Sequence, residues 1–188
     1  KDGDRVHVDG YQTIKYPHIE RHHLYSPAKS SIVLFDLDVA PDLTIGYIMG
    51  PDDGIPVALS QVGIDVVLIE EGRLDTIDLD QFDTIVTARF AYEFRSDLVA
   101  NNSRLLKWVE DGGVLIVQYN RGAWNNLNVS PYPTTIRNDR VTEEDARIDI
   151  LVPDHPIFNY PNKISAEDFE GWHQERGLYF LGEWDERY

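Results

Sequence analysis

The feature that most constrains this chain is an alternation of short apolar runs with segments of helical period, which begins at Leu43. The apolar runs cover residues 43–49, 64–69, 83–88 and 114–119, and each has the length of one strand. Strands that alternate with helices pair in parallel, because a parallel neighbour needs a crossover connection. The sequence therefore predicts an α/β domain with a mostly parallel sheet.

Helices are expected between these strands. The first covers 55–62, with Pro56 in its first turn, where the missing N–H would have no partner, and Gly63 after its end. The second begins at Ser96, which can cap it, and ends at Gly112. After the fourth run we expect a loop, a strand over 147–152, and a short helix with a capping box that starts at Ser165.

The first 41 residues have a different pattern. Short apolar alternations at 6–8 and 32–37 are broken by Pro17, Pro27 and Pro41, which favours strands and linker over helix. We therefore expect the tail of a preceding β-rich domain, or a linker, at 1–41 and the α/β domain at 42–188. The chain starts at Lys1 without Met or a charged-then-apolar leader, so we expect it to be a fragment of a longer protein.

Composition excludes several classes of function. The 33 acidic and 17 basic residues give a net charge of −16, which repels phosphate backbones and argues against nucleic acid as a partner. The longest apolar runs are too short to cross a bilayer, so no membrane insertion is expected. The chain has no cysteine, which removes disulfides, thiolate zinc sites and cysteine nucleophiles.

Candidate binding residues follow the predicted strands, because ligands of open parallel sheets bind beyond the carboxyl ends of the strands. They are Asp52 and Asp53 after the first strand, Arg89, Tyr92 and Arg95 after the third, and Gln118, Asn120 and Arg121 after the fourth. In the alternative interpretation the aspartates cap a helix and the arginines pair with surface carboxylates.

The turn after the fourth strand is the strand-to-helix corner at which several α/β hydrolases hold a nucleophile. Here it offers Tyr119 and Asn120. An amide cannot attack, and an ordinary phenol is a poor nucleophile at neutral pH, so no catalytic residue is assigned. No G-x-S-x-G motif occurs elsewhere in the chain.

The histidines predict no metal site. His18 and His22 have the spacing of two ligands on one helix face, but Pro17 and Pro27 disfavour a helix there, so we interpret them as exposed linker residues. No metal or other cofactor is expected. His155 stands between an aspartate and a proline in a turn-forming context, and it stays a ligand candidate that could face the crevice.

Residues 171–180, with Trp184 beyond them, combine aromatic rings with polar groups, a mixture that is typical of sugar sites and also of cores. We expect Leu178 and Phe180 to pack in the core. Trp172, Glu175 and Arg176 are taken as candidates for binding a ligand.

Several segments of the chain carry a family resemblance. They are Ile45-Gly46-Tyr47-Ile48-Met49-Gly50, Phe82-Asp83-Thr84-Ile85-Val86, Gly112-Gly113-Val114-Leu115-Ile116-Val117-Gln118-Tyr119-Asn120, Pro131-Tyr132-Pro133, Asp139-Arg140-Val141-Thr142 and Asp168-Phe169-Glu170-Gly171-Trp172 onward to Phe180. Together they resemble the C-terminal region of large bacterial LmbE-like (PIG-L) deacetylase proteins, a region similar to class I glutamine amidotransferase-like and ThuA-like domains. The resemblance covers roughly 42–188, and 162–180 is its most specific part.

The resemblance implies a flavodoxin-like three-layer sandwich, a periplasmic or extracellular location, and partners among the other domains of a parent chain. Two departures limit what it implies about activity. The Ala-His-Pro-Asp-Asp-Glu type motif of the zinc deacetylase domain is absent, since Pro51-Asp52-Asp53 lacks the preceding histidine, and the amidotransferase cysteine is missing at Tyr119-Asn120. The closing strand expected of the family is also missing after Tyr188, which predicts a C-terminal truncation.

Three hypotheses about function stay open. The first is a non-catalytic domain that binds a carbohydrate-like ligand or a neighbouring domain. The second is a carbohydrate-directed hydrolase that uses Asp52, Asp53, Glu175 or His155 as acid and base. The third is a structural role in domain or subunit assembly, including a homo-oligomer.

Overall fold

The computed structural model describes residues 8–30, 32, 34–51, 53–173 and 177–188. The chain divides into two compact units, Lys1–Leu37 and Asp38–Tyr188. No helix in the described part of the chain is both long enough and apolar enough to cross a membrane.

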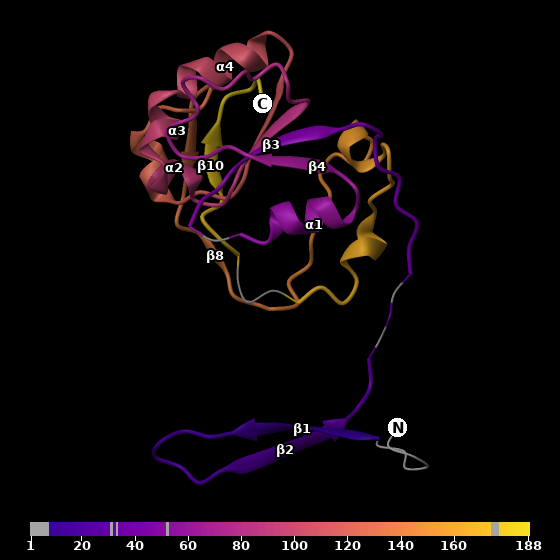
Figure 1. Cartoon of the computed structure of the whole chain (residues 1–188). Coiled ribbons are helices and arrows are strands. Elements are labelled where there is room, and N and C mark those ends of the chain that lie inside the picture. The colour runs from indigo at the N-terminus through magenta and orange to yellow at the C-terminus, as the bar shows by residue number, and fades with distance from the viewer. Residues whose placement is uncertain (1–7, 31, 33, 52, 174–176) are drawn as a thin grey trace. The chain divides into compact units, whose positions relative to one another are not determined.

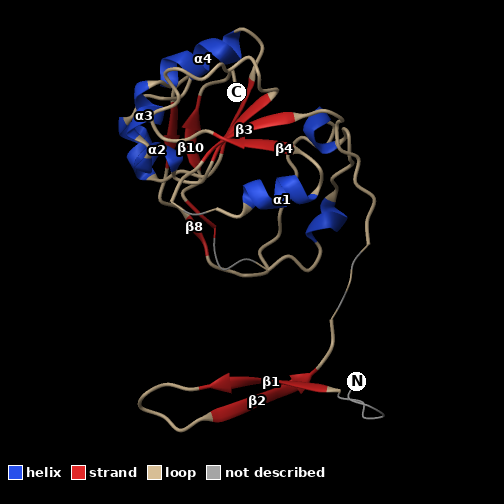
Figure 2. Ribbon diagram, in the orientation of Figure 1, coloured by secondary structure: helices blue, strands red, loops and turns tan. Residues whose placement is uncertain are grey.

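The first unit is a β-hairpin. Strand β1 (Asp9–Ile14) pairs antiparallel with β2 (His22–Pro27) (Figure 2). In this pairing Tyr11 lies opposite Tyr25. Every residue of β2 is exposed to solvent. The strands predicted at 6–8 and 32–37 are not observed: Val8 and the described residues of 32–37 lie outside strands, and residues 6, 7 and 33 lie outside the described part.

The second unit is α/β and is built on a four-stranded parallel sheet (Figure 1). Its strands are β3 (Thr44–Ile48), β4 (Asp65–Leu68), β5 (Thr84–Thr87) and β6 (Val114–Val117), in the order β4-β3-β5-β6. All four lie inside the ranges predicted from the apolar runs, which confirms a parallel sheet and an α/β class for this part of the chain.

The sheet is buried at its centre and more exposed at its edge strands, β4 and β6. Ile45 and Tyr47 of β3 and Ile85 and Val86 of β5 are buried, because both strands have a neighbour on each side. In the edge strand β6, Val114 and Ile116 are 51% and 49% exposed. The apolar core therefore gathers around β3 and β5 and thins out toward β6.

The first predicted helix is confirmed as α1 (Ile55–Gln61), with Pro56 in its first turn and Gly63 at φ 91° after its end. The second is observed as α3 (Ser96–Ala100) and α4 (Asn102–Glu110), preceded by α2 (Ala91–Phe94). The two helices are separated at Asn101, whose side-chain amide donates to the Asp97 carbonyl at 2.9 Å. The expected cap was wrong, because Ser96 is already helical and no side chain caps α3.

The C-terminal third of the chain has little regular structure. Its elements are η1 (Gly122–Asn126), β7 (Thr134–Ile136), β8 (Arg140–Val141), η2 (Pro156–Phe158), η3 (Ala166–Phe169), β9 (Gly177–Leu178) and β10 (Leu181–Trp184). Strand β7 pairs antiparallel with β10, and β8 pairs antiparallel with β9. The capping box at Ser165 is confirmed, although the helix that it starts is a short 3₁₀ helix.

Two expectations for this region were wrong. Residues 147–152 form no strand, and Leu151 is exposed, because no described strand lies alongside to pair with this segment. Leu178 is only partly buried and Phe180 is exposed, so neither joins the core. Aromatic density in this part of the sequence therefore did not indicate burial.

Candidate functional site

The loops after β3 and β5 touch at the centre of the sheet. A Cβ atom added to Gly50 would lie 2.4 Å from the carbonyl oxygen of Arg89 and 3.4 Å from the Ala88 Cβ. A carbon and an oxygen atom cannot approach so closely, so only glycine allows this packing. Open α/β sheets hold ligands in a crevice between such loops. Here the backbones of the two loops are in contact at Gly50 and Arg89, which leaves no room for a ligand between them at that point.

A buried tyrosine connects the loop after β3 to the residue after β6. The Tyr47 hydroxyl donates to the Asp53 carboxylate, and the Gln118 amide donates to the same hydroxyl at 2.9 Å. Asp53 also accepts from the backbone N–H of Ile55 at 3.0 Å. Burial, together with the Asp53 carboxylate, raises the pKa of Tyr47 well above its ordinary value, so the phenol stays protonated.

Arg95, predicted to contact a ligand, is buried in an internal ion pair. Its Nε and Nη2 atoms each lie 2.8 Å from an oxygen of Asp97, and Nη1 donates to the Ile69 carbonyl at 3.3 Å. The Asp97 carboxylate also accepts from the Gly72 N–H at 2.9 Å. The hydrogen bonds from Arg95 lower the pKa of Asp97 to about 2. The pair fixes the loop between β4 and β5.

Two other arginines predicted to bind a ligand, Arg89 and Arg121, lie near the ring of Phe90. Arg121 pairs with Glu93, with 2.8 Å from Nε to Oε2, and its guanidinium carbon lies 4.5 Å from the centre of the Phe90 ring. Arg89 lies 5.7 Å from the same ring. Pairing with a surface carboxylate is the alternative that the sequence left open for the arginines. Arg121 adopts it, whereas the carboxylate that pairs with Arg95 is largely buried.

The strand-to-helix corner lies after β5, whereas the sequence placed it after β6. Phe90 has φ 61° and ψ 10° and stands directly before α2. After β6, Arg121 is extended and leads into η1. A left-handed backbone costs a bulky residue about 1–2 kcal/mol, so the surrounding packing must hold it in place. A benzyl group at this corner cannot attack a substrate.

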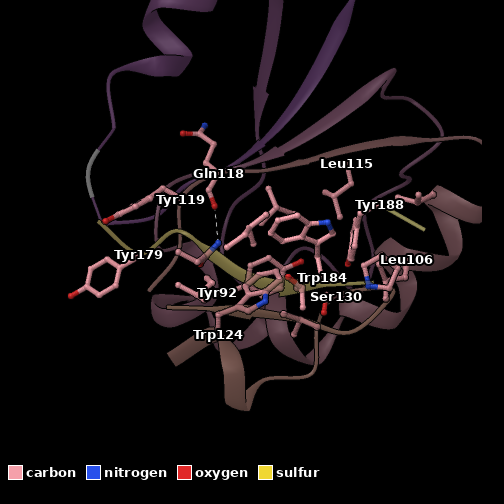
Figure 3. Close-up of a pocket in the computed structure, with 18 residues that line it drawn as sticks. Tyr92, Leu106, Leu115, Gln118, Tyr119, Trp124, Ser130, Tyr179, Trp184 and Tyr188 are labelled. Atoms are coloured by element: carbon pink, nitrogen blue, oxygen red, sulfur yellow. Dashed lines mark hydrogen bonds between the residues drawn. The ribbon is translucent and has the colours of Figure 1, made fainter. Parts of the chain in front are cut away.

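Beside β6 lies a groove of about 650 Å³ (Figure 3). Its walls come from α4 and β6 on one side and from η1, β7, β10 and the end of the chain on the other. The lining residues are Tyr92, Leu106, Val109, Leu115, Val117, Gln118, Tyr119, Asn120, Trp124, Val129, Ser130, Pro131, Thr134, Ile136, Tyr179, Leu181, Trp184 and Tyr188. Six of them are aromatic, and none has a charged side chain. The groove is thus an aromatic and largely apolar site.

A buried hydrogen-bond chain fixes the groove floor. The Tyr92 hydroxyl donates to Asn102 Oδ1 at 2.8 Å, and the Asn102 amide donates to the Val129 carbonyl at 2.8 Å. The Tyr92 ring meets Trp124 edge to face, with 5.1 Å between ring centroids. The indole of Trp124 is thereby held in place before any ligand binds.

Side chains that bond to backbone hold the opposite wall. Asn125 donates to the Ile136 carbonyl at 2.9 Å and accepts from its N–H at 2.8 Å, so it extends β7 like a further strand residue. The Tyr188 hydroxyl donates to the Tyr132 carbonyl at 3.0 Å. In Figure 3 the indole of Trp184 lies in the middle of the lining, with Tyr188 on one side and Tyr119 and Tyr179 on the other.

The structure divides the residues predicted to bind a ligand. Tyr92, Gln118 and Asn120 line the groove, and the other described candidates do not. His155 accepts a hydrogen bond from the Ile157 N–H and caps η2. Trp172 stacks on Phe169 at 5.4 Å, away from the groove lining. The candidates Asp52, Glu175 and Arg176 lie outside the described residues.

Sequence reasoning missed most of the groove. Trp124, Tyr179 and Tyr188 were not singled out, and Trp184 was noted only as an aromatic neighbour. The available signal was the aromatic density of two stretches far apart in the chain, 119–132 and 179–188. Their convergence depends on the pairing of β7 with β10, which no local pattern predicted. Within the described part of the chain, no group of three or more acidic residues and histidines could hold a metal.

No protein-family model, curated protein or solved structure matches this chain. The role of the chain is therefore inferred from the chemistry of the groove and of the polar clusters around it.

Proposed function

We propose that this chain is a non-catalytic binding module of the amidotransferase-like type, an accessory domain of an LmbE-like deacetylase protein whose aromatic groove takes a carbohydrate-like ligand. The strand order β4-β3-β5-β6 supports a flavodoxin-like architecture, because it matches the first four strands of the order 2-1-3-4-5. Right-handed crossovers in that order place α1 on one face of the sheet and α3 and α4 on the other.

The groove beside β6 carries the proposal. Its volume of about 650 Å³ lies in the range of small-molecule sites. Sugar rings stack their apolar faces on aromatic side chains, and Trp124 and Trp184 offer such faces. Ser130 adds a neutral polar group for hydroxyls. Asn120 and Thr134 also lie in the lining, but the Asn120 amide donates to the Gln118 carbonyl at 2.7 Å and the Thr134 hydroxyl to the Glu183 carbonyl at 3.1 Å, so each offers a ligand only its remaining hydrogen-bonding capacity. This combination favours a neutral or weakly charged sugar-like ligand over a phosphate or a nucleotide.

A non-catalytic role is supported by the state of the reactive groups. The left-handed corner holds Phe90, and the groove's described lining contains no carboxylate or imidazole to act as acid or base. Asp53 is engaged by Tyr47 and Ile55, and His155 caps η2. The alternative, a carbohydrate-directed hydrolase, would need two such groups beside one bound ligand.

The test compares two exposed tryptophans. Trp184, in the groove, is 59% exposed, and Trp172, outside it, is 54% exposed. On a glycan array, Trp184→Ala should abolish binding by the intact chain, and Trp172→Ala should leave it unchanged. Because both side chains are exposed, neither change should lower the melting temperature by more than a few degrees. Binding that survives Trp184→Ala would rule out the groove.

A specific observation also favours a second role, in assembly. On the face of β6 opposite the groove, Val114 and Ile116 are half exposed, whereas parallel sheets normally have both faces covered. Ile116→Glu should convert any self-associated form to monomer in analytical ultracentrifugation. A chain that is monomeric before the change at all concentrations would contradict a homo-oligomer through this face.

A further inference from the structure

We propose that the groove prefers a ligand that carries an ammonium group, as an amine-bearing sugar does, over a neutral ligand of the same shape. This inference rests on the proposed function, since it specifies the ligand class of the same groove. It depends on the distribution of charge along the sequence and on two features of the described residues, the aromatic lining and the ion pairs around the rim.

The net negative charge of the chain comes entirely from the unit that holds the groove. Lys1–Leu37 contains five basic and five acidic residues, so Asp38–Tyr188 has the other 12 basic and 28 acidic residues and the whole net charge of −16. A field of this sign raises the local concentration of cations and lowers that of anions. The α/β unit therefore favours cationic ligands before any direct contact is made.

The groove lining offers aromatic ring faces to a cation but no charged side chain. Six aromatic rings border the groove, and no described lining residue has a charged side chain that would repel an ammonium or bind it as a salt bridge. The negative faces of Trp and Tyr rings attract cations, most strongly where water is displaced. A cation could therefore be bound on the indoles of Trp124 and Trp184 without a carboxylate beside it.

Cations already occupy aromatic faces next to the groove. Arg121 lies 4.5 Å from the Phe90 ring, which in turn lies 5.4 Å from the Tyr119 ring. Arg187 lies 3.9 Å from the Tyr132 ring, which lies 5.8 Å from the Tyr188 ring. Both neighbouring sites thus show a guanidinium on a ring beside a lining tyrosine.

These two arginines do not make the rim positive. Arg121 pairs with Glu93, and Arg187 donates to Asp185 at 2.6 and 2.8 Å. Each guanidinium is therefore matched by a carboxylate, so the attraction between the acidic unit and an incoming ammonium group is preserved.

The experiment uses choline and 3,3-dimethylbutanol, which have the same shape and differ by one positive charge. Binding to the full chain is measured by isothermal titration calorimetry, with tryptophan fluorescence as a second readout. We expect choline to bind about tenfold more tightly, as one cation–π site of moderate strength would produce. Raising the salt concentration from about 0.05 M to about 0.5 M should reduce that ratio, because the field of the unit is screened.

The variant Trp184→Leu separates the π face from apolar contact, since leucine keeps apolar bulk. It should reduce the choline preference several-fold and leave 3,3-dimethylbutanol binding nearly unchanged, whereas Trp172→Leu should change neither. Far-UV circular dichroism verifies that the variants fold, and Trp124→Leu replaces Trp184→Leu if that variant does not.

The outcomes distinguish the ammonium preference from the proposed glycan-binding function. Equal binding of the two probes, or a choline preference that Trp184→Leu and Trp124→Leu both retain, would overturn the ammonium preference and leave a glycan-binding groove intact. Failure of both probes together with an empty glycan array would overturn both.

Discussion

The centre of the parallel sheet is closed by loop contacts and polar pairs, whereas its β6 edge borders an open aromatic groove. At the centre, the loops after β3 and β5 touch at Gly50 and Arg89, and the polar groups nearby bond to one another. At the edge, aromatic residues surround an open groove of about 650 Å³. Polar residues that follow parallel strands therefore do not by themselves locate the groove, because Asp53, Arg95, Gln118 and Asn120 all bond within the protein and only Gln118 and Asn120 also line it.

The largest expected effect comes from filling the closed centre. Gly50→Ala places a Cβ 2.4 Å from the Arg89 carbonyl oxygen, so one of the two loops must move. Overpacking against backbone should cost about 3 kcal/mol or more of unfolding free energy, measured by urea denaturation. The control Gly122→Ala adds a Cβ to open space and should cost less than about 1 kcal/mol. Equal effects of the two changes would show that the crevice is open.

The next effect concerns the ion pair between Arg95 and Asp97. Because the pKa of Asp97 is lowered to about 2 from an ordinary 3.8, its contribution to stability is present above pH 3.8 and is lost as the pH falls toward 2. Asp97→Asn should remove about 2 kcal/mol at neutral pH and flatten that part of the acid profile of unfolding free energy. Wild type and variant with parallel profiles between about pH 4 and about pH 2 would refute the assignment.

A smaller loss is expected from the phenol that connects the loops. Tyr47→Phe leaves Asp53 and Gln118 without their shared hydroxyl, which should cost about 1–2 kcal/mol in thermal or urea unfolding. Tyr92→Phe removes the comparable hydroxyl from the groove floor, so Asn102 Oδ1 loses the donor that holds it in place. This change should therefore also weaken ligand binding. A binding loss of the same size in Tyr47→Phe would mean that the centre also contacts the ligand.

The smallest effect has the opposite sign. The Thr87 hydroxyl is fully buried at the carboxyl end of β5, with no hydrogen-bond partner within the described residues. Thr87→Val keeps the shape and removes the unsatisfied oxygen, so the unfolding free energy should rise by about 1 kcal/mol. A decrease on calorimetric unfolding would indicate a bound water or ligand group at this hydroxyl.

Local patterns predicted the sheet and did not predict the groove. The four apolar runs became four parallel strands, because a short apolar run bounded by turn residues is typical of a strand in a buried sheet. The run at 147–152 has similar composition and formed no strand, since a strand also needs a neighbour to pair with. Likewise, the strand-to-helix corner was predicted at Tyr119-Asn120 and was observed at Phe90. The left-handed backbone of Phe90 depends on tertiary packing, so the residue type at that position does not predict it.

The sequence by itself determined the α/β class, the strand positions, the absence of a thiol nucleophile and the net charge of −16, because these follow from composition and from short-range periodicity. Only the tertiary structure decided that Arg95 and Arg121 are paired internally and that residues 65 positions apart, such as Tyr119 and Trp184, border one groove. The physical reason is that pairing partners and cavity walls come from segments distant in the chain, and their meeting depends on the energy of the whole packed unit rather than on any local preference.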